Sequence, residues 1–567
     1  MAVLPLMTGD TRSRISWIPI AWTVACLLVL GVAFFAVSWP YVDVHNNLRE
    51  ATSWDWRQYV RYAFSRGIEY RPLLTLAIKA GYQLVGLNLW IYQLLVLAQL
   101  GAVLALLLWL FQPIGSRRGL AAALALSCVV GLHTSRIFFL FIPVNAYSAA
   151  LLLLLLALVV ALDPRALRYD WVLLPLTFVA LFLLESSLLI IPLVVAMWWR
   201  RAPGVSGRGV AAMLAALVLY LGVRFAFGGP ASLGSSYVGS GLGFSEATPE
   251  SLRNTFEHAP WLFWTYNVMA SVLTVLASEP RAGVYQFIAS LLQGKTALWQ
   301  WLHIGSSLLT TALIGAALYL YRPLSERDRF LRLAGFVLIV FGSGLGFLYT
   351  RDRIALSAGI GYGLLLFVAL TMTLDRLAVT TGWRRALVVG MVSVMAIAWH
   401  LRVAEAYAQL RDSAWDYHSE WTERYADLGG AQPQTELLKG LRADALRSVP
   451  SDPRRDPAWT FALFERRYSR EDGAGRPPAD AAADNAVPSV SSPFDIRWNE
   501  TVDDTTRLQF EAELGLTDAQ RVARDPRGRT WEYRLRTPTR ERVRAIVLHP
   551  SVEDTARIDA QRFEIVQ

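Results

Sequence analysis

The chain has 567 residues, 54% of them hydrophobic, and its mean hydropathy is +0.36. Soluble globular domains contain about 45–50% apolar residues and lack apolar runs of about 20 residues, so this composition excludes an ordinary soluble protein. The net charge of +9 is carried almost entirely by arginines between apolar runs. That placement indicates membrane topology and argues against a nucleic-acid-binding protein.

Eleven apolar segments are predicted to be membrane-spanning helices. They are residues 15–37, 88–111, 119–132, 138–162, 171–184, 186–199, 209–227, 297–321, 331–349, 354–374 and 386–400. Arg12 and Arg14 place the N-terminus in the cytoplasm by the positive-inside rule. The apolar run 261–278 is assigned to the outer surface, because this choice keeps the arginine-rich segment 322–332 in the cytoplasm. We therefore expect a multi-pass protein of the cell inner (plasma) membrane whose C-terminus lies outside the cytoplasm.

Two external loops are prominent in the membrane region, which covers residues 1–400. The first, 38–87, contains the apolar stretch 72–85, which is too short for a span and suits an interfacial or re-entrant helix. The second, 228–296, combines a Gly- and Ser-rich part with aromatic, apolar segments. Long loops of this kind often close over active sites, so we expect a cap with 232–248 as its mobile part.

The C-terminal region 401–567 is predicted to be a smaller, mixed α/β region outside the cytoplasm. Residues 448–490 are rich in Pro, Ala, Asp and Arg and are typical of a linker or a disordered segment. Alternating stretches such as TWEYRLRT, residues 530–537, indicate strands.

Charged and titratable residues gather on the side of the membrane assigned as external. The candidates for a site are Asp43, Asp55, Arg71, His133, Glu185, Arg351 and Arg353. Arginine grips phosphate with two parallel hydrogen bonds, and a carboxylate can take a proton from an attacking hydroxyl. The cluster therefore suits a lipid-phosphate substrate. The alternative interpretation is structural: solvated or buried acids near helix ends, a histidine anchor at His133, and a headgroup anchor at Arg71.

Four segments carry a resemblance to a known family, in the order in which that family has them. They are YRPLLTLAIKAGYQLVGLNLWIYQLLVLAQL (70–100), HTSRIFFLFIPVNAYSAALLLLLLAL (133–158), LLESSLLIIPLVV (183–195) and TRDRIALSAGIGYGLLL (350–366). Over roughly residues 10–400 the chain resembles GT-C glycosyltransferases. It is most similar to O-mannosyltransferases that carry tetratricopeptide repeats and, more loosely, to lipid A aminoarabinose transferases. It departs from them in having Val44 after Asp43, with no adjacent acid pair, and Leu184 where the family has Lys.

The resemblance implies a GT-C fold and the transfer of a sugar from a polyprenyl-phosphate donor to a glycan, lipid or protein acceptor. Asp43 would be the general base of an inverting displacement. Arg353, with Arg71 and Arg351, would hold the donor phosphate. Glu185, Asp55 and His133 are further substrate-binding candidates. The His, Cys, Asp and Glu residues show no metal-ligand spacing, but some relatives use a divalent cation, so metal dependence stays open.

Two other classes of function remain open from sequence. The first is a transporter or flippase of a lipid-linked sugar, which would tend to show two related halves with broken spans. No such halves are found in this chain. The second is a non-catalytic scaffold of envelope assembly that uses 401–567 to bind partners. A common cavity containing Asp43 and Arg353 would favour the enzyme over the scaffold.

Overall fold

The computed structural model describes most of the membrane region and short parts of the C-terminal region. The described residues are 15–37, 51, 54–65, 70–86, 89–139, 144–228, 239–240, 259–277, 284–321, 325–350, 352–377, 380–419, 494–498, 521–523, 531–535 and 563–566. The chain divides into two compact units. The first comprises residues 1–419 with 448–470, and the second comprises 420–447 with 471–567.

The first unit is mainly helical in its described part, and each of the eleven predicted spans contains a helix. These helices are α1 (Ile18–Val37), α5 (Leu89–Phe111), α6 (Ser116–Gly131), α7 (Ala146–Leu162), α8 (Leu173–Leu183), α9 (Ile190–Trp199), α10 (Gly207–Gly228), α14 (Leu298–Leu320), α15 (Glu326–Gly344), α16 (Leu356–Leu377) and α17 (Gly382–Ser419). Within the described ranges, six helices are long and apolar enough to cross a membrane: α1, α5, α10, α14, α16 and α17. The chain is therefore a helical, membrane-embedded protein.

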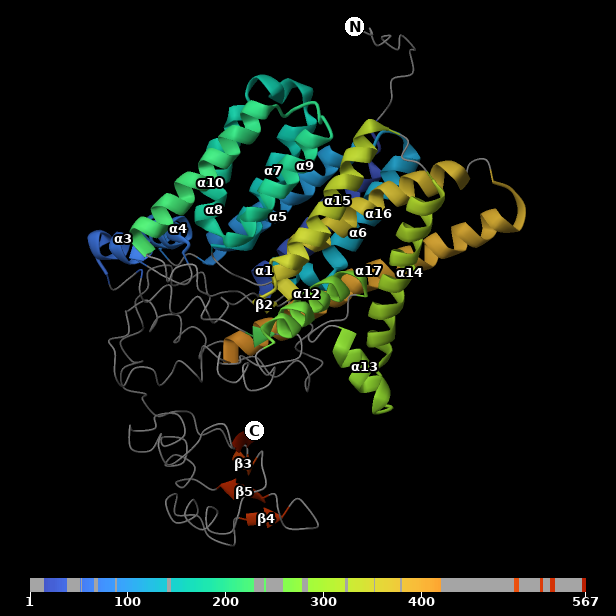
Figure 1. Cartoon of the computed structure of the whole chain (residues 1–567). Helices are drawn as coiled ribbons and strands as arrows, with labels where there is room; N and C mark the ends of the chain where they lie inside the picture. The colour runs from blue at the N-terminus through green and yellow to red at the C-terminus, as the bar shows by residue number, and fades with distance from the viewer. Residues whose placement is uncertain are drawn as a thin grey trace. The chain divides into compact units, whose positions relative to one another are not determined.

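Helix α16 forms the centre of the bundle (Figure 1), where it packs against α15 and α6. Every residue from Leu356 to Leu374 is buried. Glycines allow α15 to approach it closely, since a Cβ atom at Gly361 would lie only 2.7 Å from the carbonyl oxygen of Gly335. Small residues permit this kind of contact between membrane helices.

Helix α7 begins at Ala146, eight residues later than the predicted span 138–162. The physical reason is Asn145, whose side-chain oxygen accepts a hydrogen bond from the backbone N–H of Ser148 at 3.1 Å and caps the helix. The first two residues of the predicted span, Phe138 and Phe139, belong instead to η1, a 3-10 helix at His133–Phe139. Apolar character alone could not locate this start.

Shorter elements lie between these helices. They are α3 (Trp56–Ser65), α4 (Pro72–Val85), η2 (Pro164–Arg168), η3 (Asp170–Val172), η4 (Glu185–Leu189), α12 (Pro260–Leu276), α13 (Val284–Leu292) and η6 (Asp352–Ala355). The predicted short helix 72–85 is present as α4. Two-residue strands β1 (Gly239–Ser240) and β2 (Tyr349–Thr350) pair in parallel, which joins the loop after α10 to the segment that precedes η6.

The second unit contains one antiparallel sheet of four strands in its described residues. The strands are β3 (Phe494–Trp498), β4 (Arg521–Ala523), β5 (Trp531–Leu535) and β6 (Phe563–Val566), in the order β4-β5-β3-β6. Strand β5 lies within the stretch TWEYRLRT that the alternating pattern predicted to be a strand. Residues 448–490 lie outside the described part of the chain.

Candidate functional site

Two residues that are distant in sequence meet between α4 and η4. Arg71 immediately precedes α4, and its Nε donates to Oε2 of Glu185 at 2.8 Å. Glu185 is available there because the backbone turns extended at Leu184, which ends α8 and starts η4. The two side chains are 25% and 29% exposed, so the pair lies at the edge of the packed interior. The structure thus brings together two of the residues proposed from sequence to bind substrate.

A second cation lies close to this pair. Arg224 of α10 is buried and donates from Nη1 to the hydroxyl of Tyr220 at 2.5 Å. Its guanidinium carbon lies 5.6 Å from the ring centre of Tyr70 and 5.8 Å from that of Tyr220, within cation–π range. Sequence reasoning missed Arg224, although an arginine close to the C-terminal end of the apolar run 209–227 was a signal for it.

Tyr70, next to Arg71 in sequence, is fully buried among these groups. Its hydroxyl has no hydrogen-bond partner in the part of the chain that the structure describes. Burial raises the pKa of Tyr70 to about 12; the neighbouring Tyr220 adds to this rise, and the charge of Arg224 opposes it. The phenol is therefore protonated at neutral pH and can donate a hydrogen bond.

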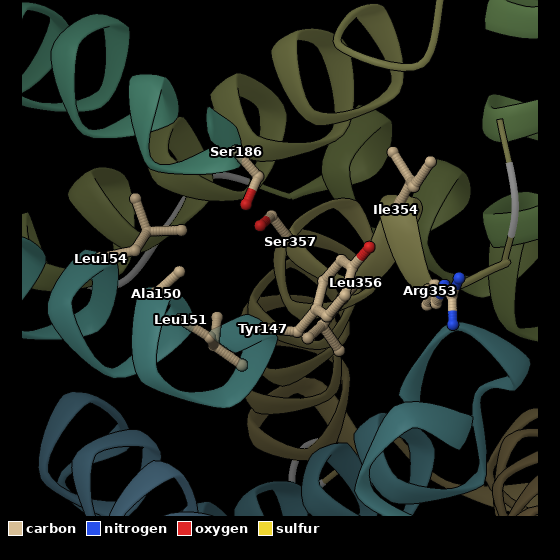
Figure 2. Close-up of a pocket in the computed structure, with 9 residues that line it drawn as sticks. All are labelled: Tyr147, Ala150, Leu151, Leu154, Ser186, Arg353, Ile354, Leu356 and Ser357. Atoms are coloured by element: carbon tan, nitrogen blue, oxygen red, sulfur yellow. The ribbon is translucent and has the colours of Figure 1, made fainter. Parts of the chain in front are cut away.

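A small pocket, partly open to solvent, adjoins η4 at Ser186. Its lining consists of Tyr147, Ala150, Leu151, Leu154, Ser186, Arg353, Ile354, Leu356 and Ser357. Figure 2 shows the hydroxyls of Ser186 and Ser357 directed into the space between α7 and α16, with Arg353 at one end. The Arg353 guanidinium carbon lies 5.9 Å from the ring centre of Tyr147. Because Ser186 follows Glu185, η4 connects this pocket with the Arg71–Glu185 pair.

The segment η6, which contains Arg353, packs against η1. His133 begins η1 and is buried, and it does not line the pocket. The next residue, Thr134, lies so close to α16 that a Cβ atom at Gly359 would be 2.2 Å from its hydroxyl oxygen. His133 therefore occupies a supporting position behind the arginine segment.

Asp55 lies away from the pocket, on the exposed surface at the start of α3. Its Oδ1 accepts a hydrogen bond from the backbone N–H of Gln58 at 2.8 Å, which is the geometry of a helix cap. Near it, the buried Lys79 of α4 donates from Nζ to the carbonyl oxygens of Ala51 and Trp54 at 2.7 and 2.6 Å. Burial lowers the pKa of Lys79, and the charge of Asp55 opposes this change. Lys79 therefore ties the chain just before α3, at residues 51 and 54, to α4.

Several predicted features lie outside the described residues. They include Asp43, Arg351 and nearly all of 232–248, of which only Gly239 and Ser240 are described. Among the residues that are described, no group of three His, Cys, Asp or Glu side chains could hold a metal ion. The described groups that could bind a ligand are instead cationic or hydroxylic.

A separate polar cluster lies where α17 meets α14 and the end of α6. Arg402 is almost fully buried and stacks on Trp399, with its guanidinium carbon 4.1 Å from the ring centre. It donates to the carbonyl of Gly131 at 3.2 Å and to the hydroxyl of Ser307 at 2.7 Å. The sequence assigned residue 402 to the region beyond the last span, so this buried cation was not anticipated.

The Arg71–Glu185 pair and the pocket beside it together form the candidate site, and its geometry determines what it can bind. Arg71, Arg224 and Arg353 outnumber the single carboxylate of Glu185, so the surroundings are net positive, and arginine favours phosphate over neutral ligands. The hydroxyls of Tyr147, Ser186 and Ser357 add the hydrogen-bonding groups that a sugar needs.

A comparison of the chain with protein-family models, with curated proteins and with solved structures finds no match.

Proposed function

We propose that the protein is an inverting GT-C-type glycosyltransferase. It moves a sugar from a polyprenyl-phosphate donor to a glycan, lipid or protein acceptor on the extracytoplasmic face of the plasma membrane. In this proposal the chain crosses the membrane eleven times, and the C-terminal region 401–567 lies on the same side as the active site.

One observation carries the proposal. Arg71, Glu185 and Arg353 come from three separate segments that the sequence placed on the external side. Arg71 and Glu185 form an ion pair, and the pocket lined by Arg353 begins at the residue after Glu185. Arginines held beside a polar pocket are what a phosphate-binding site requires.

The proposed roles follow from the chemistry of the groups. Asp43 takes the proton of the acceptor hydroxyl or amine, and the freed electron pair attacks the anomeric carbon of the donor sugar. The bond from that carbon to the phosphate oxygen breaks, and polyprenyl phosphate leaves with the bonding electrons. Arg353, with Arg71 and Arg351, stabilises the negative charge that develops on the leaving phosphate.

The remaining groups position these three arginines and the donor. Glu185 holds the guanidinium of Arg71 at the rim of the site. The hydroxyls of Ser186 and Ser357 would contact the sugar. Strand β1 connects the cap loop 228–296 to the backbone that leads into the arginine segment, so movement of the loop would be transmitted to Arg353.

The test is mass spectrometry of envelope glycans and lipids from three strains: wild type, a strain without the protein, and a strain with Arg353→Ala. The proposal predicts that one sugar substituent is absent from both altered strains and that the lipid-linked donor accumulates. Complementation with Arg384→Ala, at the exposed start of α17, is the matched control and should restore the substituent. Identical glycan and lipid profiles in all strains would contradict the proposal.

A further inference from the structure

Helix α3 has an unusual distribution of exposed side chains. At about 100° per residue, Trp56, Val60 and Phe64 form one stripe along the helix. Trp56 and Val60 are 41% and 39% exposed, although both are large and apolar. The buried residues Tyr59 and Ala63 lie on one flank of this stripe. The stripe is thus the outward part of a wide apolar face: Trp56 and Val60 are exposed and Phe64 is half-buried, whereas the inward part is covered.

The other flank of the stripe is basic. Arg57 and Arg61 are exposed, four residues apart, and directly beside the apolar stripe. Neither has a carboxylate partner in the described part of the chain. The uncharged residues Gln58 and Ser65 occupy the side farthest from the apolar face. A helix that lies in a membrane interface has this order of apolar, basic and polar rows.

The position of α3 matches the level of a membrane boundary. The ring centre of Phe64 lies 5.7 Å from that of Phe227, which ends the candidate span Gly207–Phe227 of α10. Phe227 is itself 63% exposed, so the apolar stripe of α3 continues the apolar surface of the span. In Figure 1, α3 and α4 lie beside each other at this end of α10. The indole of Trp56, which donates to Gln83 at 2.5 Å, is the side chain most typical of such a boundary.

We propose that α3 is a surface that binds anionic phospholipid of the surrounding bilayer. Trp56, Val60 and Phe64 enter the boundary of the acyl chains, and Arg57 and Arg61 reach the phosphates of neighbouring headgroups. Because Lys79 joins α4 to residues 51 and 54, which precede α3, lipid binding fixes this part of the chain and α4 against the membrane. The inference does not depend on glycosyl transfer.

The observations favour anionic lipid over the other sources of phosphate. An exposed arginine pair gains little from free phosphate in water, since the charges are screened. Beside an inserted apolar stripe, each arginine near an anionic surface contributes about a fivefold gain in affinity, so the pair contributes about 30-fold. Zwitterionic phosphatidylcholine supplies the same apolar contact without this gain.

The experiment measures hydrogen exchange of the backbone amides at 54–65 in the full-length protein in detergent, during titration with phosphatidylglycerol. We expect protection to appear at a phosphatidylglycerol concentration about 30-fold lower for wild type than for Arg57→Gln/Arg61→Gln. Arg57→Lys/Arg61→Lys should retain the wild-type midpoint within a few fold, because headgroup attraction needs charge. The control pair Arg384→Gln/Arg385→Gln removes the same charge from exposed positions at the start of α17 and should leave the midpoint unchanged.

Two further titrations distinguish the source of the phosphate. Phosphatidylcholine and inorganic phosphate should each give no protection at concentrations where phosphatidylglycerol is effective. Equal protection by phosphatidylcholine would show that the stripe acts without the arginines and would overturn the proposal. A wild-type midpoint in Arg57→Gln/Arg61→Gln would overturn it equally.

Discussion

The Nε atom of Arg71 lies 2.8 Å from Oε2 of Glu185, across a sequence separation of 114 residues. The contact joins the start of α4 to the break between α8 and α9. Because each side chain is about a quarter exposed, solvent screens the pair and it adds little to stability. Its main consequence is geometric, since it fixes where the guanidinium of Arg71 can point.

A double-mutant cycle measures how much the Arg71–Glu185 pair contributes to the free energy of unfolding. Arg71→Gln and Glu185→Gln should each lower the free energy of unfolding, and the double variant should lose less than their sum. We expect a coupling energy of about 1 kcal/mol or less, the range of partly exposed pairs. Chemical unfolding in detergent gives the three values. Strict additivity would show that the two residues do not interact in the folded protein.

The raised pKa of Tyr70 predicts that the free energy of unfolding depends on pH in the alkaline range. Its folded pKa of about 12 exceeds the ordinary 10.0, so the folded chain keeps a proton that the unfolded chain releases between these values. The contribution of Tyr70 to stability is thus complete below pH 10 and is lost as the pH rises toward 12. The loss should approach roughly 2–3 kcal/mol, at 1.36 kcal/mol per pKa unit.

Tyr70→Phe removes this titration, and the buried hydroxyl has no partner among the described residues. The variant should therefore be within about 1 kcal/mol of wild type at pH 7 and should lose less stability between pH 9 and 11.5. Thermal unfolding midpoints across that range measure the difference. Parallel curves for the two proteins would refute the assignment of the raised pKa to Tyr70.

The contact of α15 with α16 requires glycine at position 361. In Gly361→Ala the new methyl group would meet the Gly335 carbonyl oxygen at 2.7 Å and the Leu338 Cβ at 2.8 Å. We expect the variant to lose about 1–3 kcal/mol, as is typical of overpacking. Gly305→Ala is the matched control, because nothing lies within 4 Å of a Cβ atom there. It should be neutral or slightly stabilising, since alanine favours helix; equal effects at both sites would contradict the close packing.

Arg402 should be important for stability, although it has no part in the proposed reaction. Arg402→Leu leaves the carbonyl of Gly131 and the hydroxyl of Ser307 without a buried donor. We expect a loss of about 2–4 kcal/mol, because unsatisfied buried polar groups are costly. Arg384→Leu, at an exposed position of the same helix, should change stability by less than about 0.5 kcal/mol. Thermal unfolding in detergent would show whether the two variants differ in this way.

Much of the fold was predictable because the apolar runs of membrane helices are long and are separated by segments that contain arginine. The same signal fails where a helix boundary depends on one side chain. Asn145 ends an apolar stretch by capping α7, and α17 continues to Ser419 although its apolar run ends near residue 400. Hydropathy alone therefore does not determine where such helices begin and end.

The candidate site was predictable only as a set of charged residues near the ends of apolar runs. Arg71, Glu185 and Arg353 could be proposed because charged residues are rare near spans and are placed there at a cost. Their contacts could not be predicted, since the packing of α4 on α8 is fixed by many apolar side chains together. Arg224 and Arg402 were missed because the sequence pattern does not distinguish two kinds of arginine beside an apolar run. One kind is solvent-exposed and marks membrane topology, and the other turns inward and is buried.

The affinity of the purified protein for a short-chain polyprenyl phosphate tests the central claim most directly. Arg353→Ala should bind this probe more weakly by about 2–5 kcal/mol, the cost of removing one partner of a desolvated charge pair, and Arg353→Lys should recover only part of the loss. Asp43→Asn should bind like wild type, because a general base acts on the acceptor; its effect belongs to turnover, with a loss of about 10²–10⁴-fold. Arg384→Ala controls for the loss of one positive charge. If Arg353→Ala binds the probe as tightly as wild type, Arg353 does not hold the donor phosphate and the account is wrong.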